Sequence, residues 1–237
     1  MHERVPLNGL VRRLMKDCEE ALGEKVEIEF ALTFDEEAEG RARFGFLQVR
    51  PLVVSHEFVE VAKADLTADG VLLASENVMG NGSAEGVRDV VYVRPGHFDP
   101  SLTRVAAMEI AAINNRLLEE RRPFLLIGFG RWGSSDPSLG IPMDWGQICG
   151  ARAIVEATLP KMNVDLSQGS HFFHNISSFE VSYFCVRHDT DDRIDWEWLE
   201  GRRPESDTGL VRHLRLAEPL AIRVDGRTGR GVIRTRG

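Results

Sequence analysis

The sequence predicts an α/β fold, with α+β as the alternative, because strand-like and helical patterns alternate along most of the chain. The alternation is clearest after residue 88, where a strand, a helix, a second strand and a glycine-rich loop follow one another. The 237 residues suffice for one large domain or two small ones, and 43% hydrophobic residues is typical of a packed core. This composition excludes a disordered or fibrous protein.

The N-terminal part of the chain predicts a helix followed by a β-hairpin. Apolar side chains recur with helical spacing over residues 7–22, and Gly23 follows as a C-cap. Val26–Leu32 and Phe44–Arg50 alternate as strands do, and Pro51 ends the second one. The acidic, glycine-containing turn between them predicts that the two strands pair antiparallel.

A domain boundary near residue 55 is expected, which divides the chain into residues 1–54 and 55–237. Residues 53–74 show a weaker, strand-like pattern. Met79–Gly86 contains three glycines in eight residues and predicts a loop.

The larger segment predicts the α/β part of the fold. Asp89–Val93 and Phe124–Ile127 have the apolar composition of buried strands, and Pro100–Arg121 places apolar residues at helical spacing. Trp145–Ala157 fits either a helix or a helix followed by a strand, and Val181–Val186 fits a strand. The chain then ends in short strands and turns.

The charge of the chain is unevenly distributed. The formal net charge is −8, whereas residues 201–237 contain nine arginines against four acidic residues. An acidic chain is a poor match to the phosphate backbone of nucleic acids, so no nucleic-acid partner is expected. The arginine-rich end fits either phosphate contacts or a solvated basic face.

No membrane partner is expected either, because no apolar run approaches the roughly 20 residues that cross a bilayer. The charged N-terminal segment does not fit a signal peptide. Cys18, Cys149 and Cys185 are widely spaced, which predicts buried thiols rather than disulfides or a zinc site. We expect a soluble, cytoplasmic protein; whether it forms a homodimer stays open.

The glycine-rich segment GFGRWGSSDPSLG is a candidate phosphate-binding loop. Gly128 and Gly130 would let backbone amides approach an anion closely, Arg131 offers a bidentate donor, and Ser134 can donate through its hydroxyl. A tight connection between a strand and a helix explains the same residues, so both interpretations stay open.

The hairpin offers a second candidate site. Glu29, Gln48 and Arg50 would share one face of the sheet, because side chains alternate along a strand. A carboxylate, a carboxamide and a guanidinium would suit magnesium and a nucleotide phosphate. The alternative is a solvated face with a Glu–Arg ion pair. Glu27 lies two residues before Glu29, so its side chain would be on the same face and could pair with the arginine.

Two stretches of this hairpin, VEIEFAL and FGFLQVRPL, resemble the closing hairpin of the nucleotide-binding domain in the phosphoenolpyruvate synthase and pyruvate phosphate dikinase family. That domain is ATP-grasp-like, and its last strand reads close to LQxRP. The resemblance implies that Glu29 and Gln48 hold magnesium and ATP and that Arg50 neutralises phosphate charge during catalysis. Residues 90–235 also resemble the C-terminal part of bacterial homologues of these enzymes.

The segment SQGSHFFHN contains His171 and His174, which could ligate a metal from one helix face or lie as ordinary histidines at the edge of an element. The resemblance adds a third interpretation. In this family a swivelling domain carries the phospho-accepting histidine in a GGxTSHAAI segment between two strands. His171 matches that histidine, which implies a phosphoryl acceptor, and a neutral imidazole is competent in that role near neutral pH.

The resemblance therefore implies a short ATP-grasp-like hairpin remnant followed by a mixed α/β domain that is a divergent swivelling phosphohistidine domain. It implies part of an ATP-dependent phosphotransferase, or kinase, that interconverts pyruvate and phosphoenolpyruvate through a phosphohistidine. ATP and magnesium are then the cofactors of the parent enzyme, and the chain alone is expected to be inactive. The alternative is a non-catalytic regulatory module that binds a phosphorylated metabolite at the Gly128–Gly140 loop.

Overall fold

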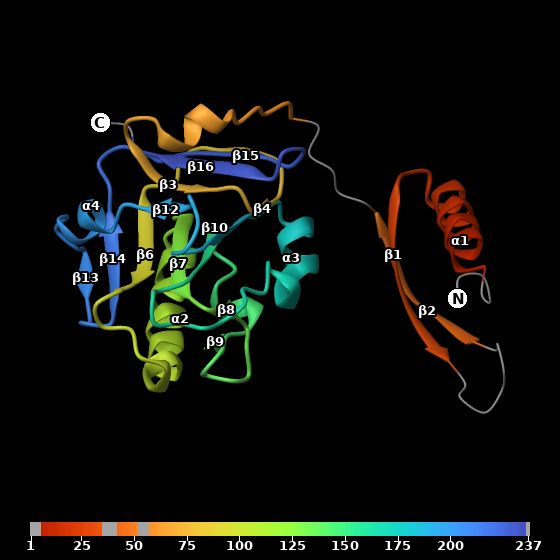
Figure 1. Cartoon of the computed structure of the whole chain (residues 1–237), viewed down its shortest axis with the longest axis horizontal. Helices are drawn as coiled ribbons and strands as arrows, with labels where there is room; N and C mark the ends of the chain where they lie inside the picture. Colours follow the sequence, from red (N-terminus) through yellow and green to blue (C-terminus); the bar gives the residue numbers. More distant parts are fainter. Residues whose placement is uncertain (1–5, 35–41, 52–56, 236–237) are drawn as a thin grey trace. The chain divides into compact units, whose positions relative to one another are not determined.

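The computed structural model describes residues 6–34, 42–51 and 57–235, with the side chains of His171, Phe173 and His174 left out of the description. Helices and strands are mixed, as the sequence predicted at that level. The chain divides into two compact units, residues 1–54 and 55–237 (Figure 1). Each unit is described by itself.

Unit 1 consists of a helix and a two-stranded antiparallel sheet, which confirms the predicted helix and hairpin. Helix α1 (Leu7–Leu22) ends at Gly23, whose φ of 75° places it in the left-handed region that glycine adopts without strain. Strands β1 (Val26–Phe34) and β2 (Ala42–Pro51) pair with an irregularity between Glu29 and Phe30.

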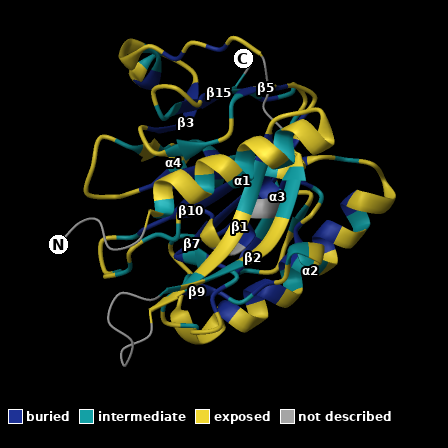
Figure 2. Ribbon diagram, turned by 90° about the vertical axis from the view of Figure 1, so that its right-hand side faces the viewer, coloured by how far each residue is buried: buried dark blue, intermediate teal, exposed yellow. Residues whose placement is uncertain are grey.

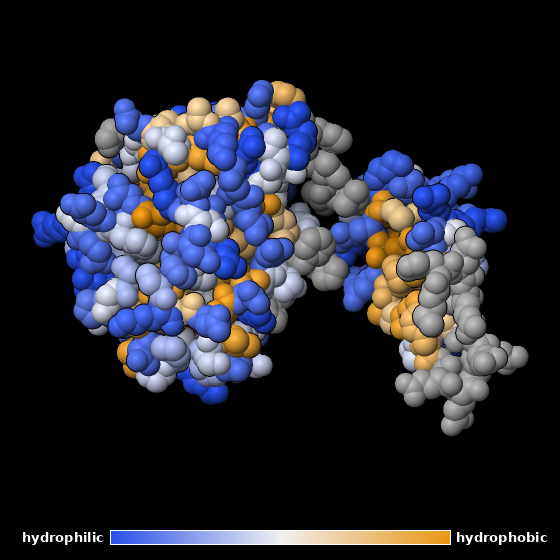
Figure 3. Space-filling view, viewed as in Figure 1, coloured by the Kyte–Doolittle hydropathy of each residue, from blue (hydrophilic) through white to orange (hydrophobic). Residues whose placement is uncertain are grey.

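Unit 1 encloses little apolar surface of its own. Among its described residues Val26 is buried, whereas α1 contributes no buried residue, as the absence of dark blue on this helix in Figure 2 shows. Large apolar side chains remain exposed instead; they are Leu10, Leu22, Phe30, Phe34, Phe46 and Leu47. Figure 3 shows orange, hydrophobic surface on this unit. One helix on a hairpin thus leaves unit 1 with a thin core.

Unit 2 is built around a seven-stranded sheet in the described part of the chain. In hydrogen-bonded order its strands are β13 (Ser206–Asp207), β14 (Val211–Arg215), β6 (Asp89–Val93), β7 (Phe124–Phe129), β10 (Ala151–Ala157), β11 (Ser182–Val186) and β4 (Val78–Met79). The four strands β6, β7, β10 and β11 run parallel, and β14 and β4 flank them antiparallel. Their near-continuous apolar sequences fit strands that are covered on both faces.

A five-stranded antiparallel sheet covers one face of this central sheet. Its strands, in hydrogen-bonded order, are β12 (Arg193–Ile194), β3 (Val71–Ser75), β16 (Arg230–Arg234), β15 (Ala221–Asp225) and β5 (Gly82–Ala84). The sheets touch where a Cβ atom on Gly231 would lie 2.5 Å from Cε1 of Phe184. In Figure 1, β15 and β16 run crosswise to the strands of the central sheet.

The other face is covered by α2 and by the segments that follow β7 and β10. Helix α2 (Thr103–Glu119) continues from the short 3₁₀ helix η2 (Pro100–Leu102) and buries one side, dark blue in Figure 2, through Ala106, Ile110, Ile113 and Leu117. The shorter elements are η1 (Lys63–Thr67), β8 (Arg131–Trp132), β9 (Gly140–Ile141), η3 (Trp145–Gln147), η4 (Ser170–Phe172), α3 (Phe173–Ser178) and α4 (Trp196–Glu200).

The helix expected over Pro100–Arg121 is present up to Glu119, with the 3₁₀ helix η2 as its first turn and α2 as the rest. The loop expected over Met79–Gly86 needs correction, because this segment contributes to β4 and contains β5, whose backbones pair with distant strands. Of the segment 53–74, expected to be strand-like, residues 57–74 hold η1 and the first four residues of β3. Of the described residues, no helical stretch is both long and apolar enough to cross a membrane.

Candidate functional site

Two of the segments singled out from the sequence meet at one edge of the central sheet. The Gly128–Gly140 loop begins at the end of β7, and the SQGSHFFHN segment follows β10; these strands are parallel neighbours, so their carboxyl ends lie at the same edge. Nε of Arg131 donates a hydrogen bond at 2.7 Å to the carbonyl oxygen of Asp165, which precedes the SQGSHFFHN segment by two residues. Ligands of α/β proteins commonly bind at this edge.

The side chain of Glu156 connects the two segments through hydrogen bonds. It lies near the carboxyl end of β10 with none of its surface exposed. Its carboxylate accepts a hydrogen bond from the backbone N–H of Trp132 at 3.1 Å, and others from the N–H groups of Ser167 at 2.8 Å and Gln168 at 3.1 Å. The Ser167 hydroxyl donates to it as well. No pattern in the sequence marks this glutamate, because it stands within the apolar run of β10.

The glycines of the Gly128–Gly140 loop have close neighbours within the protein. The Trp132 ring occupies the space of a Cβ on Gly128, and its Nε1 donates to the Val155 carbonyl at 2.9 Å. Gly130 has a φ of 72°, and a Cβ there would lie 2.5 Å from the Leu139 carbonyl oxygen. Packing therefore explains these glycines, and their role in phosphate binding stays a prediction.

The polar side chains of the same loop are placed differently from each other. Ser134 is buried, and its hydroxyl donates to the carbonyl of Asp136 and accepts from the N–H of the same residue, which closes a turn. Arg131 is half-buried and partnered by the Asp165 carbonyl. Arg131 thus remains the better placed of the two to meet an anion.

The backbone of His171 lies in η4, within the connection between β10 and the parallel strand β11. Two consecutive residues before it, Gln168 and Gly169, have φ values of 52° and 73°. A Cβ on Gly169 would lie 2.8 Å from Cδ1 of Ile176, so glycine fits this place for two reasons. The side chains of His171 and His174 lie outside the described residues, and their proposed roles are untested.

The polar face of the hairpin in unit 1 brings four side chains together. Glu29 and Gln48 are direct cross-strand partners, and Glu27 is paired with Arg50 in the same register. Nε of Arg50 lies 3.0 Å from Oε1 of Glu27, and its Nη2 donates to Oε1 of Gln48 at 3.2 Å. The Glu–Arg pair that the sequence allowed is present, on the face that holds the three predicted ATP and magnesium residues.

Ion pairs neutralise part of the arginine-rich C-terminal end. Five of the nine arginines in residues 201–237 pair with acidic residues of unit 2, at 2.7 to 3.4 Å; the pairs are Arg212–Asp207, Arg215–Asp89, Arg227–Asp225, Arg230–Glu76 and Arg234–Asp65. Because Asp65, Glu76 and Asp89 lie outside residues 201–237, part of the positive charge of this end offsets acidic residues elsewhere in the unit.

A charge cluster at the opposite edge of the central sheet is not apparent from the sequence. Asp89, the first residue of β6, contacts Nε2 of His213 and the guanidinium groups of Arg122 and Arg215. Burial alone would raise the pKa of Asp89, but the hydrogen bonds from His213 and Arg122 outweigh it and hold this pKa at about 2. The cluster is a charge network centred on a buried carboxylate.

This cluster has the spacing of a metal site but not its charge. Potential ligand atoms of Asp89, Glu205 and His213 lie within 4.8 Å of one another. Arg122 donates to both Asp89 and Glu205 and so occupies these oxygens with a positive charge. A divalent cation would have to displace that arginine, so the structure favours an ion-pair network here.

The cysteines correct one expectation. Cys185 is buried, as predicted, and burial raises the pKa of its thiol well above the usual value. Cys149 is exposed and Cys18 is half-buried, because the first follows η3 at the surface and the second belongs to the helix of unit 1. Both are free thiols.

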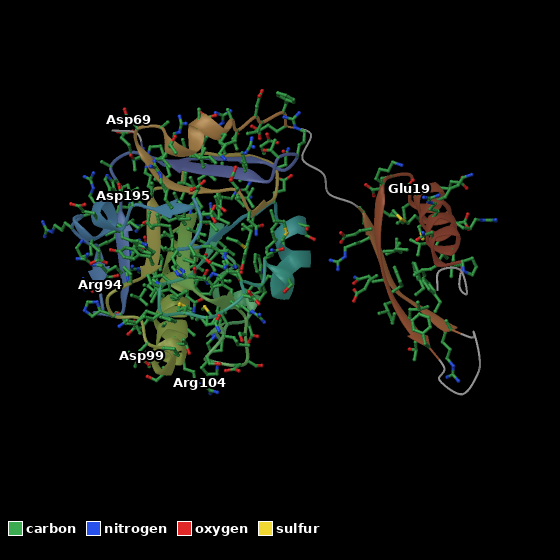
Figure 4. All side chains as sticks on the ribbon, viewed as in Figure 1. Glu19, Asp69, Arg94, Asp99, Arg104 and Asp195 are labelled. Carbon is green, nitrogen blue, oxygen red and sulfur yellow. The ribbon has the colours of Figure 1, made fainter. Side chains whose placement is uncertain are left out.

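A cavity of about 340 Å³ lies elsewhere in unit 2, lined in part by Asp69, Arg193, Asp195 and Trp198. Figure 4 labels Asp69 and Asp195 on its wall, and labels Arg94, Asp99 and Arg104 along the course from the end of β6 to the start of α2. The described lining includes none of the residues singled out from the sequence.

The chain was compared with protein-family models, with curated proteins and with solved structures, and none of them matches it.

Proposed function

We propose that the chain is part of a phosphoenolpyruvate synthase-like, ATP-dependent phosphotransferase, in which unit 2 carries a phosphoryl group on His171. The observation that carries the proposal is the meeting of two predicted motifs at the carboxyl ends of β7 and β10, joined by Glu156 and by the contact between Arg131 and Asp165. The sequence pattern alone did not require these segments to be neighbours.

The chemistry is a phosphoryl transfer in two steps. The lone pair of one imidazole nitrogen of His171 attacks phosphorus, an N–P bond forms, and the bond from phosphorus to the leaving oxygen breaks. In the second displacement, pyruvate loses a methyl proton, the resulting enolate oxygen forms a bond to phosphorus, and the N–P bond breaks, which returns the imidazole. Arg131, on the neighbouring segment, supplies a guanidinium that would offset the charge of the phosphoryl oxygens.

Unit 1 would contribute to the nucleotide site of the same enzyme. The carboxylate of Glu29 and the carboxamide oxygen of Gln48 are hard ligands of the kind that Mg²⁺ prefers. Arg50 lies on the same face and would bind phosphate oxygens, in exchange for part of its contacts with Glu27 and Gln48. Magnesium would there shield the charge of the ATP phosphates from the attacking group.

A module that binds a phosphorylated metabolite without chemistry is the second candidate. Arg131 favours it, because its half-exposed position at the sheet edge suits an anion whether or not His171 reacts. In that case the same loop would bind the ligand and the histidine would stay unmodified.

The decisive experiment is to treat the protein that contains these residues with magnesium and radiolabelled ATP, or with radiolabelled phosphoenolpyruvate. We expect label that is stable in alkali, labile in acid and located on His171 by mass spectrometry. His171→Ala should abolish it, while His174→Ala, the matched control three residues away, should retain it. Absence of label in the unmodified protein, or full label in His171→Ala, would refute the carrier role.

A further inference from the structure

The carboxylate of Glu156 has an unusual set of partners for a side chain on a central strand. Oε1 accepts from the Trp132 N–H and the Ser167 hydroxyl, and Oε2 accepts from the N–H groups of Ser167 and Gln168. Trp132 belongs to the segment after β7, and the other two belong to the segment after β10. One buried carboxylate therefore fixes two segments to each other.

These contacts use both oxygens of the side chain as acceptors. A buried carboxylate is costly unless its oxygens are satisfied, and here the surrounding backbone and hydroxyl groups all donate. An amide of the same shape would replace one acceptor oxygen by an NH₂ group, which would face two of these donors. Glutamine at this position would therefore keep the side-chain volume of glutamate but lose the hydrogen bonds to one of the two segments.

The attachment lies immediately before the segment that contains His171. Gln168 and Gly169 turn the chain through two consecutive positive φ angles, and η4 begins at the next residue. Gly169 packs against Ile176 and Tyr183, so the turn has little room to shift. The hydrogen bonds to Glu156 thereby set where the backbone of η4 starts relative to the Arg131 segment.

We infer that Glu156 is a positioning residue of the phosphoryl site: it holds the Arg131 segment and the His171 segment at the separation that phosphoryl transfer needs. This inference rests on the proposed function. Glu156 itself touches neither substrate nor phosphorus. Its effect is on geometry, where displacements of about 1 Å can change rates by as much as about a hundredfold.

The test compares Glu156→Gln with a matched control, Asp225→Asn. Asp225 is equally inaccessible and accepts from the backbone N–H groups of Val61, Arg227 and Thr228, but it ends β15 in the other sheet. In both variants, a buried carboxylate that accepts hydrogen bonds from backbone N–H groups is replaced by a carboxamide. Only one of them changes the proposed site.

The probe is phosphoramidate, a small donor that phosphorylates imidazole without a second protein. A ring nitrogen of histidine forms the N–P bond, the P–N bond of phosphoramidate breaks, and ammonia leaves. Mass spectrometry measures the rate at His171 relative to that at the exposed His97 of the same molecule. Because both rates come from one sample, differences in phosphoramidate concentration and reaction time cancel in the ratio.

We expect the ratio to fall about tenfold or more in Glu156→Gln and to stay unchanged in Asp225→Asn. Hydrogen exchange should increase at the amides of Trp132, Ser167 and Gln168 in the first variant only. An unchanged ratio in Glu156→Gln, or an equal fall in both variants, would overturn the positioning role. A wild-type protein whose His171 reacts no faster than His97 would instead count against the proposed function.

Discussion

Nε2 of His213 lies 2.8 Å from Oδ1 of Asp89, and both side chains are almost completely inaccessible to solvent. Nδ1 of the same ring lies 2.8 Å from Nη2 of Arg116, which belongs to α2. Because arginine can only donate, Nδ1 accepts from Arg116, and Nε2 donates to Asp89. The ring thus links α2 to the buried carboxylate of β6.

Asp89→Asn should destabilise unit 2 by about 3 kcal/mol, because it leaves the guanidinium groups of Arg122 and Arg215 without their shared buried anion. Urea unfolding at pH 7 measures this loss. Asp99→Asn, at an exposed carboxylate that only caps η2, is the control and should cost much less. Equal losses in the two variants would contradict a central role for Asp89.

The same carboxylate predicts a pH dependence. The folded-state pKa of Asp89, about 2, is lower than its ordinary value of 3.8. The folded state therefore binds this proton less readily than the unfolded state, and the resulting stability is present above pH 4 and lost as the pH falls towards 2. Urea unfolding between pH 5 and pH 2 should show this decrease in the wild type, and a smaller one in Asp89→Asn.

Gly169→Ala should destabilise the chain by roughly 1–3 kcal/mol, because the new Cβ combines a positive φ with a close approach to Ile176. Gly86→Ala is a matched control, since Gly86 has a similar φ of 81° and no atom within 4 Å of its Cβ position. Thermal unfolding should rank Gly169→Ala as the more damaging change. The opposite ranking would show that Ile176 can move away from the new Cβ without a loss of stability.

Alkylation should distinguish the cysteines. Iodoacetamide at pH 8 should modify the exposed Cys149 in the folded protein and leave Cys185 intact, because burial both blocks access and raises the pKa of its thiol. Peptide mass spectrometry before and after denaturation in urea checks the order. Rapid modification of Cys185 in the folded state would mean that β11 opens readily.

Arg50→Met should weaken binding of magnesium ATP by the protein that contains this chain by about tenfold, because one phosphate cation is lost. Arg43→Met is the control on the same strand, since Arg43 is exposed and lies outside the group formed by Glu27, Glu29, Gln48 and Arg50. Calorimetric titration with magnesium ATP measures both. Equal affinities in the two variants would count against the nucleotide site.

Local patterns predicted the elements that local interactions define. The helix over residues 7–22 and the antiparallel hairpin that follows it were predicted from apolar spacing, strand alternation and the turn between the strands, whereas the register that pairs Glu29 with Gln48 is known from the structure. Strands β4 and β5 did not, because each has only two or three residues and pairs with strands far along the chain.

In the candidate site too, some residues could be predicted from the sequence and others could not. Arg131 and His171 lie in segments whose composition is distinctive, so the sequence could single them out. Glu156 stands in the apolar run ARAIVEA, and its donors lie 11 to 24 positions away, so no spacing pattern identifies it. The partners of Asp89 lie 33, 124 and 126 positions from it along the chain, so no spacing pattern identifies that cluster either.

The order of strands in the five-stranded sheet makes β16 its connecting strand. β16 pairs with β3 on one side and with β15 on the other. β3 also pairs with β12, and β15 also pairs with β5, so β16 joins two strand pairs that have no other link within this sheet. Deletion of residues 230–237 would therefore separate this layer into two unconnected strand pairs.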